Sequence, residues 1–376
     1  LPEAGSEEAN RLNKDIARHV KARFCLNEGT HYKYHDELEY ASEAEKWLQM
    51  AATESDKLIT SGRYEIYNTG HPQEDYFNMY RIDDKSDLKE AVLYVDYKTN
   101  IREHNMAAAG REAGCGFSKS FVESFLCSDG LPISLSNKYL GDETMRKETA
   151  NRDPRLKQLI LTNDFPTNVT DDLKDSTFVV NEDEFITQHC FTGYRPIKGF
   201  NPIYSQALYM KSSFDDMANS NPEPLLLTAN PKSELNTITN ADLDRTVNQL
   251  RDRVGMPHLT VNVGFTDPKW PDWGYSLSPV LQEIRRERCI ELAGEGFRFN
   301  DLKRWKAGKL LNNVLTYVGK RKPDGNLAIV YPNYTNPDLS YQAGKSRTWE
   351  DKMYLYPIPT GELQRNPQLL PQNPGW

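Results

Sequence analysis

Carboxylate pairs are the residues of this chain that would carry hydrolytic chemistry, because glycoside hydrolysis needs two acids facing each other across a sugar bond, about 5–10 Å apart. The densest acidic group is Glu287, Glu291 and Glu295, spaced four residues apart. Arg288 and Arg298 each stand three residues from a member of this group, a spacing at which helical side chains meet. Carboxylates paired in this way are poor proton donors. The pattern therefore disfavours an enzyme, and we predict no catalytic residue.

The histidines offer one pair with ligand-like spacing. His31 and His35 are four residues apart and could form half of a metal site. Gly29 and the aromatic residues between the two histidines favour a turn with packed rings instead. The sequence contains no H-E-x-x-H, no G-x-S-x-G and no phosphate-binding loop. We therefore expect neither a metal nor a cofactor.

The five cysteines show no C-x-x-C and no paired zinc spacing. Two of them, Cys25 and Cys289, lie within helical apolar patterns, where a free thiol behaves as a small hydrophobic group. The odd number argues against a complete framework of intrachain disulfides, although one bridge remains open. The other three are Cys115, Cys127 and Cys190.

Aromatic residues point to binding rather than catalysis, since flat rings and a few polar groups recognise small ligands such as neutral sugars. They make up 11% of the chain, with 20 tyrosines. Trp270 and Trp273 flank Pro271, and such a rigid loop would present rings with little loss of entropy. The alternative for every candidate is a ring that anchors the core or a loop. The predicted ligand-binding residues are Trp270, Trp273, Tyr275, Tyr76 and Tyr80; Tyr64, Tyr67, Phe77 and Tyr317 are further candidates.

The composition of the chain limits the classes of protein to which it can belong. The chain has 376 residues, enough for a large core, and 27% of them are charged. The formal net charge is −8, with acids and bases interspersed, which argues against nucleic-acid binding. No apolar run approaches 18 residues, so no membrane-spanning helix is predicted.

The elements that must position these residues begin with two helices. Apolar spacing predicts a helix over residues 10–27, broken at residues 28–30 because Gly29 suits a left-handed helix end. Ser42 and Glu45 are spaced as a capping box for a second helix, which Gly62 ends. Together they predict a helix–turn–helix pair over residues 1–62.

Residues 63–236 read as a loop-rich mixed region. Residues 90–97 predict a short strand, and residues 178–180 predict another. The charged corner at residues 152–155 contains a helix-blocking proline, and no nucleophile or metal cluster lies near it in the sequence. We interpret that corner as structural.

Residues 237–376 carry the strongest helical patterns. Thr239 caps a predicted helix that ends at Val254. A second begins near Glu283, and Gly294 and Gly296 loosen its end before a further apolar surface. So many aromatics beside its charges suggest a seam packed under another element. An ordinary amphipathic helix with surface salt bridges remains the alternative.

Three separated motifs resemble the SusD/RagB-like nutrient-binding lipoproteins of Bacteroidetes. The first is E-I-R-R-E-R-C-I-E-L-A-G-E-G-F-R-F-N-D-L-K-R-W at residues 283–305. The second is the terminal pattern Y-L-Y-P-I-P, E-L, N-P and Q-N-P-G-W between residues 354 and 376. The third is D-G-L-P-I at 129–133 followed by R-D-P-R-L at 152–156. The motifs stand in the family's order, which makes the resemblance specific.

The resemblance implies a mainly α-helical SusD-like fold, with tetratricopeptide-like helix pairs, a loop-rich insertion and a few short strands. It also implies a protein held by a lipid anchor on the outer face of the outer membrane. Such a protein captures glycans and delivers them to a SusC-like TonB-dependent transporter. The alternatives within the family are a peptide-binding member and one that acts only as a transporter lid or in assembly.

Two departures from the family pattern lead to further expectations. Leu1 is not preceded by a signal peptide or a lipidation cysteine, and the sequence begins well inside the usual family sequence, so we expect about the first third to be missing. Ser220 replaces a family arginine, and three prolines at 222, 224 and 231 predict a shortened or broken helix there.

The three regions, 1–62, 63–236 and 237–376, are expected to form one integrated domain. Within it, the signature residues are assigned to stabilising the scaffold. They are Glu287, Glu291, Arg298, Asp301, Arg304 and Trp305.

Overall fold

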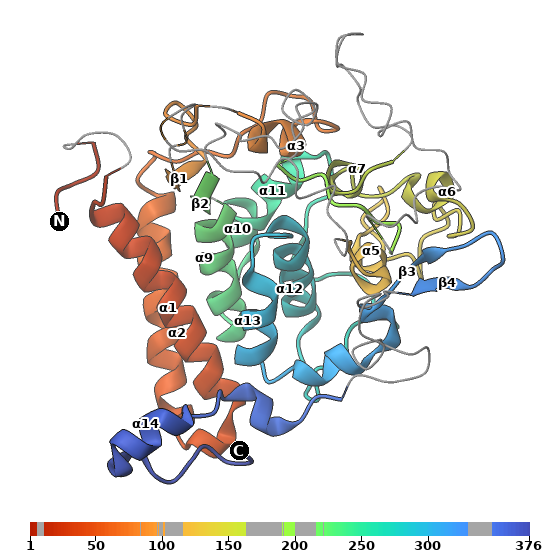
Figure 1. Ribbon diagram of the computed structural model, residues 1–376. Helices are drawn as coiled ribbons and strands as arrows, with labels where there is room; N and C mark the ends of the chain where they lie inside the picture. The colour runs from red at the N-terminus through yellow and green to blue at the C-terminus, as the bar shows by residue number, and fades with distance from the viewer. Residues whose placement is uncertain are drawn as a thin grey trace.

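Helices dominate the computed structural model (Figure 1), which confirms the expected mainly α-helical fold. The strands form two antiparallel two-stranded sheets among the described residues. The described residues are 1–5, 11–82, 84–95, 97, 101, 116–162, 190, 192–199, 216–220, 222–329 and 348–376.

The first two helices, α1 (Lys14–Tyr34) and α2 (Ala44–Ile59), pack side by side along one edge of the molecule (Figure 1). The predicted break at residues 28–30 is wrong, because α1 continues through Gly29. A Cβ atom at Gly29 would lie 2.8 Å from Cγ of Leu48 and 2.9 Å from its backbone nitrogen. Glycine is needed there for close approach of the two helices.

The predicted capping box of α2 is also wrong. Ser42 lies in a short 3-10 turn, Ala41–Glu43, and Glu43 precedes the helix without a side-chain cap. Helix α1 is capped instead by Asn13, whose side chain accepts hydrogen bonds from the backbone nitrogens of Asp15 and Ile16.

Helix α9 (Pro222–Glu234) packs against α1, α2 and α12 in the centre of the molecule (Figure 1). The predicted shortening or break does not interrupt it, since it is continuous over its 13 residues. Pro222 and Pro224 lie in its first turn, where backbone N–H groups have no intrahelical partner to lose. Pro231 lies inside the helix. Packing against α1, α2 and α12 holds the helix together.

The helix predicted from Thr239 to Val254 is two helices, α10 (Asn240–Asp244) and α11 (Val247–Arg253). Thr239 caps α10 as expected, with Asp242 completing a capping box. The interruption falls at Thr246, whose hydroxyl donates to the backbone oxygen of Asp242, 2.5 Å away. A side chain that bonds the backbone four residues earlier competes with the helical pattern.

The signature sequence forms α12 (Pro279–Glu291) and α13 (Phe297–Arg304). Gly294 and Gly296 have φ angles of +78° and +82° and make the turn between them. This confirms that the two glycines end the first helix. α12 packs on α9 over a core that includes Leu225, Leu226, Leu243, Leu250 and Ile284.

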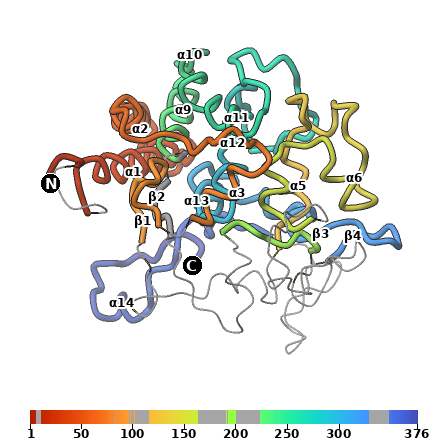
Figure 2. Tube along the Cα trace, turned by 90° about the horizontal axis from the view of Figure 1, so that it is seen from above, coloured from red at the N-terminus to blue at the C-terminus, as the bar shows by residue number. Residues whose placement is uncertain are grey.

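Shorter elements accompany these central helices. The strand predicted within residues 90–97 is confirmed as β1, whereas residues 178–180 lie outside the described residues. The remaining α-helices and strands are α3 (Asp75–Tyr80), β1 (Ala91–Val95), α5 (Lys119–Ser124), α6 (Met145–Thr149), α7 (Arg155–Leu159), β2 (Asp216–Ser220), β3 (Val318–Arg321), β4 (Leu327–Ile329) and α14 (Thr360–Arg365). Figure 1 and Figure 2 show α5, α6, β3 and β4 on the side of the molecule opposite α1 and α2.

The histidine pair and the cysteines take structural positions. The rings of His31 and His35 stack with their centroids 4.0 Å apart, and Nε2 of His35 lies 2.8 Å from the backbone oxygen of Lys303. Cys25, Cys127 and Cys190 are buried free thiols, and Cys289 is half-buried. Across the described part of the chain, no helix combines the length and apolar character needed to cross a membrane.

Candidate ligand-binding site

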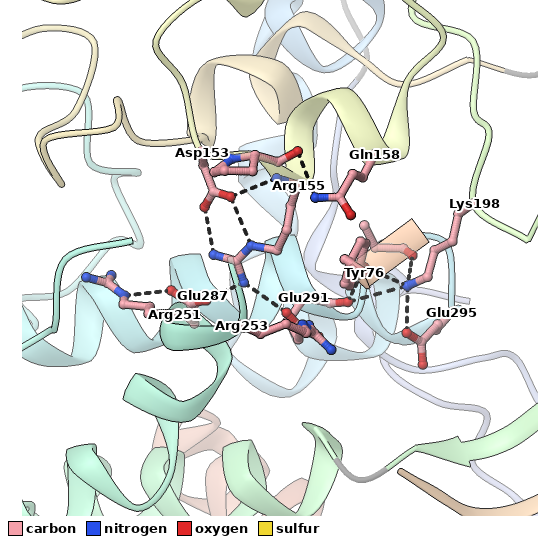
Figure 3. Close-up of polar contacts among 12 residues, drawn as sticks. Tyr76, Asp153, Arg155, Gln158, Lys198, Arg251, Arg253, Glu287, Glu291 and Glu295 are labelled. Atoms are coloured by element: carbon pink, nitrogen blue, oxygen red, sulfur yellow. Dashed lines mark hydrogen bonds and ion pairs between the residues drawn. The ribbon is translucent and has the colours of Figure 1, made fainter. Parts of the chain in front are cut away.

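A buried ion cluster joins the signature helix to the rest of the fold (Figure 3). Glu287 and Glu291 lie one turn apart on α12. Nη1 of Arg155, at the start of α7, donates to Glu287 over 2.5 Å and to Glu291 over 2.9 Å. Glu291 is 0% exposed. The surface-salt-bridge interpretation of this helix is therefore wrong, because these carboxylates lie under other elements.

Two further arginines complete the cluster. Nε of Arg251 donates to Glu287 over 3.0 Å, and Nη2 of Arg253 donates to Glu291 over 2.5 Å. Burial raises the pKa of Glu287, but Arg155 and Arg251 lower it more. These partners come from α7 and α11. Arg288, three residues before Glu291 in the sequence, instead donates to Asp301 over 2.8 Å.

Two predicted ligand residues, Tyr76 and Tyr80, pack beside this cluster. The prediction for Tyr76 is wrong, because the residue is 0% exposed and its hydroxyl donates to the backbone oxygen of Glu291. Tyr80 is half-buried and donates to the carboxylate of Glu295 over 2.9 Å. Nζ of Lys198 lies over the ring of Tyr80, 4.3 Å from its centroid, and pairs with Glu295.

The proline-bound loop uses its tryptophans as anchors. Trp273 is only 5% exposed and packs edge-to-face on Trp305, with the guanidinium of Arg285 4.6 Å from its ring centroid. The prediction that Trp273 presents its ring to a ligand is therefore wrong. Trp270 is half-buried, and its Nε1 donates to Glu283 over 2.7 Å. Its role in ligand binding stays a prediction.

Tyr275, the last predicted ring, lines a cavity. The cavity has a volume of about 360 Å³ and lies between the end of α1, the end of α9 and the start of α12. Its lining residues are Lys33, Tyr34, Asp36, Ser233, Glu234, Asn236, Tyr275, Ser276, Leu277, Ser278 and Leu281.

Two stacked rings form one wall of this cavity. Tyr34 and Tyr275 lie nearly parallel, with centroids 4.3 Å apart and an angle of 18° between planes. The hydroxyl of Tyr275 donates to the backbone oxygen of Trp305, and Arg285 donates to the hydroxyl of Tyr34. Burial raises the pKa of Tyr275 to about 12, so its hydroxyl stays protonated at neutral pH. These bonds fix both rings before any ligand binds.

Glu234 brings a charged group to the lining of the cavity. Glu234 accepts hydrogen bonds from Arg285, Lys33 and Tyr34 over 2.9, 2.8 and 2.5 Å. Burial raises the pKa of Glu234, but Arg285 and Lys33 lower it on balance. A carboxylate held ionised in this way cannot act as a general acid at neutral pH.

Hydroxyl groups supply hydrogen-bonding capacity. The hydroxyl of Ser233 is buried and has no hydrogen-bond partner among the described residues. Ser276 is exposed, and Ser278 caps α12 by accepting from the backbone nitrogen of Leu281. A buried hydroxyl without a partner is costly unless water or a ligand satisfies it. The cavity lining therefore contains a hydroxyl with unused hydrogen-bonding capacity.

Most of the cavity was missed by reasoning from the sequence. Tyr34 and Glu234 are 200 residues apart, and only the fold brings them together. Arg285 belongs to the signature stretch, but no local pattern indicates that it would join Glu234 rather than a neighbouring acid.

A sequence model described as the SusD family matches residues 59–376. The chain is similar to SusD-like protein P2 of Formosa agariphila, with 30% identity over 154 residues. That alignment covers 41% of this chain and 24% of the relative. The chain thus matches only about a quarter of the length of this relative.

Solved structures share the fold. A SusD-like protein from Bacteroides fragilis has a TM-score of 0.66 and 22% identity, over 100% of this chain and 67% of that one. A SusD-like carbohydrate binding protein from the same organism has a TM-score of 0.65 and 21% identity, over 98% of this chain and 66% of that one. At these identities, the likeness is one of fold.

Proposed function

The chain belongs to the SusD family, and from this premise we propose that it binds glycans in the cavity between α1, α9 and α12. The observation that carries the proposal is the cavity wall of two fixed tyrosine rings beside hydroxyl groups that are free to bind. The name of the similar Bacteroides fragilis structure, a carbohydrate binding protein, supports the same class of ligand.

The chemistry of the cavity favours a sugar over an apolar ligand. Its volume of about 360 Å³ lies at the lower end of small-molecule pockets, which suits one or two sugar units. Tyr275 supplies apolar ring surface for the C–H groups of a pyranose. Ser233, Ser276 and the Lys33–Glu234 pair supply donors and acceptors for its hydroxyls. Because Glu234 stays ionised, the proposed function is capture without hydrolysis.

The test is isothermal titration with a panel of soluble neutral polysaccharides. It compares the parent with a variant in which a large side chain fills the cavity. Ser276 is exposed and lines the cavity, so Ser276→Trp is expected to block it without disturbing the core. We expect at least a tenfold loss of affinity, about 1.4 kcal/mol. Ser86→Trp, at an exposed turn outside the cavity, is the matched control and should bind like the parent.

Trp270→Ala in the same titration separates the cavity from the neighbouring loop. Binding lost in Trp270→Ala but kept in Ser276→Trp would move the glycan site to the loop. A folded parent that binds none of the polysaccharides would contradict glycan capture and favour the peptide-binding or lid alternatives.

We further propose that the protein acts at the outer face of the outer membrane and passes its ligand to a SusC-like TonB-dependent transporter. Family membership supports this role. Co-purification of the natural full-length protein with a TonB-dependent transporter from outer-membrane extracts would test it. Uptake of the bound glycan that does not depend on this protein would contradict it.

A further inference from the structure

A second cavity opens between α1 and α13, which are neighbours in the bundle (Figure 1). Its volume is about 610 Å³, and α9 and α12 also contribute to its lining. It shares no lining residue with the cavity beside Tyr275. The lining residues are Val20, Arg23, Phe24, Leu26, Asn27, Leu227, Arg288, Glu295, Gly296, Phe297, Asn300, Asp301 and Arg304.

Two buried guanidinium groups of this cavity share one carboxylate. Nε of Arg288 donates to Asp301 over 2.8 Å, and Nε of Arg304 donates to the other oxygen of Asp301 over 3.0 Å. Arg288 is 3% exposed, and its Nη1 has no hydrogen-bond acceptor among the described residues. One buried positive charge is therefore left without its own counter-charge.

The other charged lining residues do not supply that counter-charge. Arg23 donates to Glu223 on α9 from its Nε over 2.6 Å. Glu295 pairs with Lys198 over 2.7 Å and accepts from Tyr80. With these partners counted, four basic side chains face three carboxylates: Arg23, Lys198, Arg288 and Arg304 against Glu223, Glu295 and Asp301.

The start of α13 adds positive potential to the same cavity. Gly296 and Phe297 line it, and Gly296 precedes this eight-residue helix without any side-chain cap. The first backbone N–H groups of a helix have no intrahelical acceptor, and the helix dipole favours an anion beside them. The unpartnered arginine nitrogen and the uncapped helix end are separate observations that favour the same kind of ligand.

Apolar side chains also line this cavity, beside its arginines. Phe24 is 55% exposed, and Val20 precedes it by one turn of α1. Phe297 is enclosed between Arg23 and Arg288, whose guanidinium carbons lie 5.1 and 5.3 Å from its centroid. The exposed ring of Phe24 therefore offers a surface for stacking, and Asn300 adds an amide at the exposed side of the cavity.

From these observations we propose that the cavity between α1 and α13 binds a uronic-acid unit of an acidic glycan. The carboxylate of the sugar pairs with Arg288 and Arg304, and its ring lies against Phe24. This inference rests on the proposed function only in taking the ligand to be a glycan, since it concerns a separate cavity.

The experiment is titration with oligogalacturonate and with its methyl ester, which keeps the sugar ring but removes the negative charge. We expect the free acid to bind at least tenfold more tightly than the ester. Phe24→Ala and Asn300→Trp should each weaken binding of the acid at least tenfold. Phe299→Ala is the matched control, because Phe299 is a similarly exposed ring of α13 that does not line the cavity.

Three outcomes would overturn this assignment. The first is equal binding of the acid and the ester, and the second is acid binding that survives both Phe24→Ala and Asn300→Trp. The third is tighter binding of a glutamate-rich peptide than of any uronate oligomer tested, whether galacturonate, glucuronate or mannuronate. In that case Phe24→Ala and Asn300→Trp would abolish binding of the peptide as well as of the oligomers. Ser276→Trp distinguishes this result from the proposed function, since it should impair neutral glycans and leave the acid unaffected.

Discussion

At the scale of single residues, the signature glutamates Glu287 and Glu291 bind arginines from distant segments, and their role in stabilising the scaffold stays a prediction. Glu291 forms ion pairs with Arg155 of α7 and Arg253 of α11, and all three side chains are buried. Removing one partner of a buried ion pair leaves the others desolvated and uncompensated, which is costly.

We therefore expect Glu291→Ala to lower the free energy of unfolding by about 3–5 kcal/mol. Glycan affinity of the protein that remains folded should be unchanged, because Glu291 lines neither cavity. Urea unfolding and titration of the same preparation measure both quantities. Glu362→Ala, which removes an exposed pair with Arg365, is the control and should change stability by less than about 1 kcal/mol. Normal stability with lost binding would refute the scaffold role.

At the scale of elements, close helix packing explains where local patterns mislead. Gly29 has the sequence character of a helix end, yet it lies within α1 against Leu48 of α2. Its role depends on a residue in another helix, so no local signal distinguishes the two outcomes. Thr239 and Gly294, whose effects are local, were predicted correctly.

Gly29→Ala should therefore destabilise the protein, although alanine is the better helix former. The new Cβ would lie 2.8 Å from Leu48, so α1 and α2 must move apart, at a cost of about 1–3 kcal/mol. Gly361→Ala in α14 is the matched control, since the methyl carbon added there would have no heavy atom within 4 Å. Thermal unfolding should show a lower melting temperature for Gly29→Ala alone. Equal shifts in the two variants would contradict the packing role.

The same distinction between local signals and contacts across the chain applies to the candidate sites. Exposure is a property that a sequence indicates only on average, so Trp273 and Tyr76 were expected outside and lie inside. Tyr275 lines a cavity, and its role in ligand binding stays a prediction; its stacking partner Tyr34 comes from the end of α1. The family and the helical fold could be predicted from motifs, whereas the cavities depend on contacts across the chain.

At the scale of the whole molecule, buried carboxylates couple stability to pH. Glu223 on α9 is bound by His19 and Arg23 of α1. Burial raises its pKa, but these partners lower it to about 2, against an ordinary value of 4.5. Because the folded pKa is the lower one, this stabilisation is fully present above pH 4.5 and is lost as pH falls toward 2.

We expect the melting temperature to fall between about pH 4.5 and pH 2, and Glu223→Gln to flatten part of that fall while lowering stability at neutral pH. Calorimetry over this range measures both effects. Exposed Glu65→Gln serves as the control and should leave the profile unchanged. An unchanged acid profile in Glu223→Gln would show that this carboxylate is not held ionised by α1.

The ion cluster of Figure 3 also bears on biosynthesis. Arg155, Arg251 and Arg253 all precede Glu287 and Glu291 in the chain, so a ribosome delivers these cations before their acceptors on α12. Asp153 and Glu90, which also bind Arg155 and Arg253, are made earlier, but each of these arginines gains its partner on α12 only when Glu287 and Glu291 have emerged. The cluster is therefore completed only in the last quarter of synthesis, after most of the chain has been made.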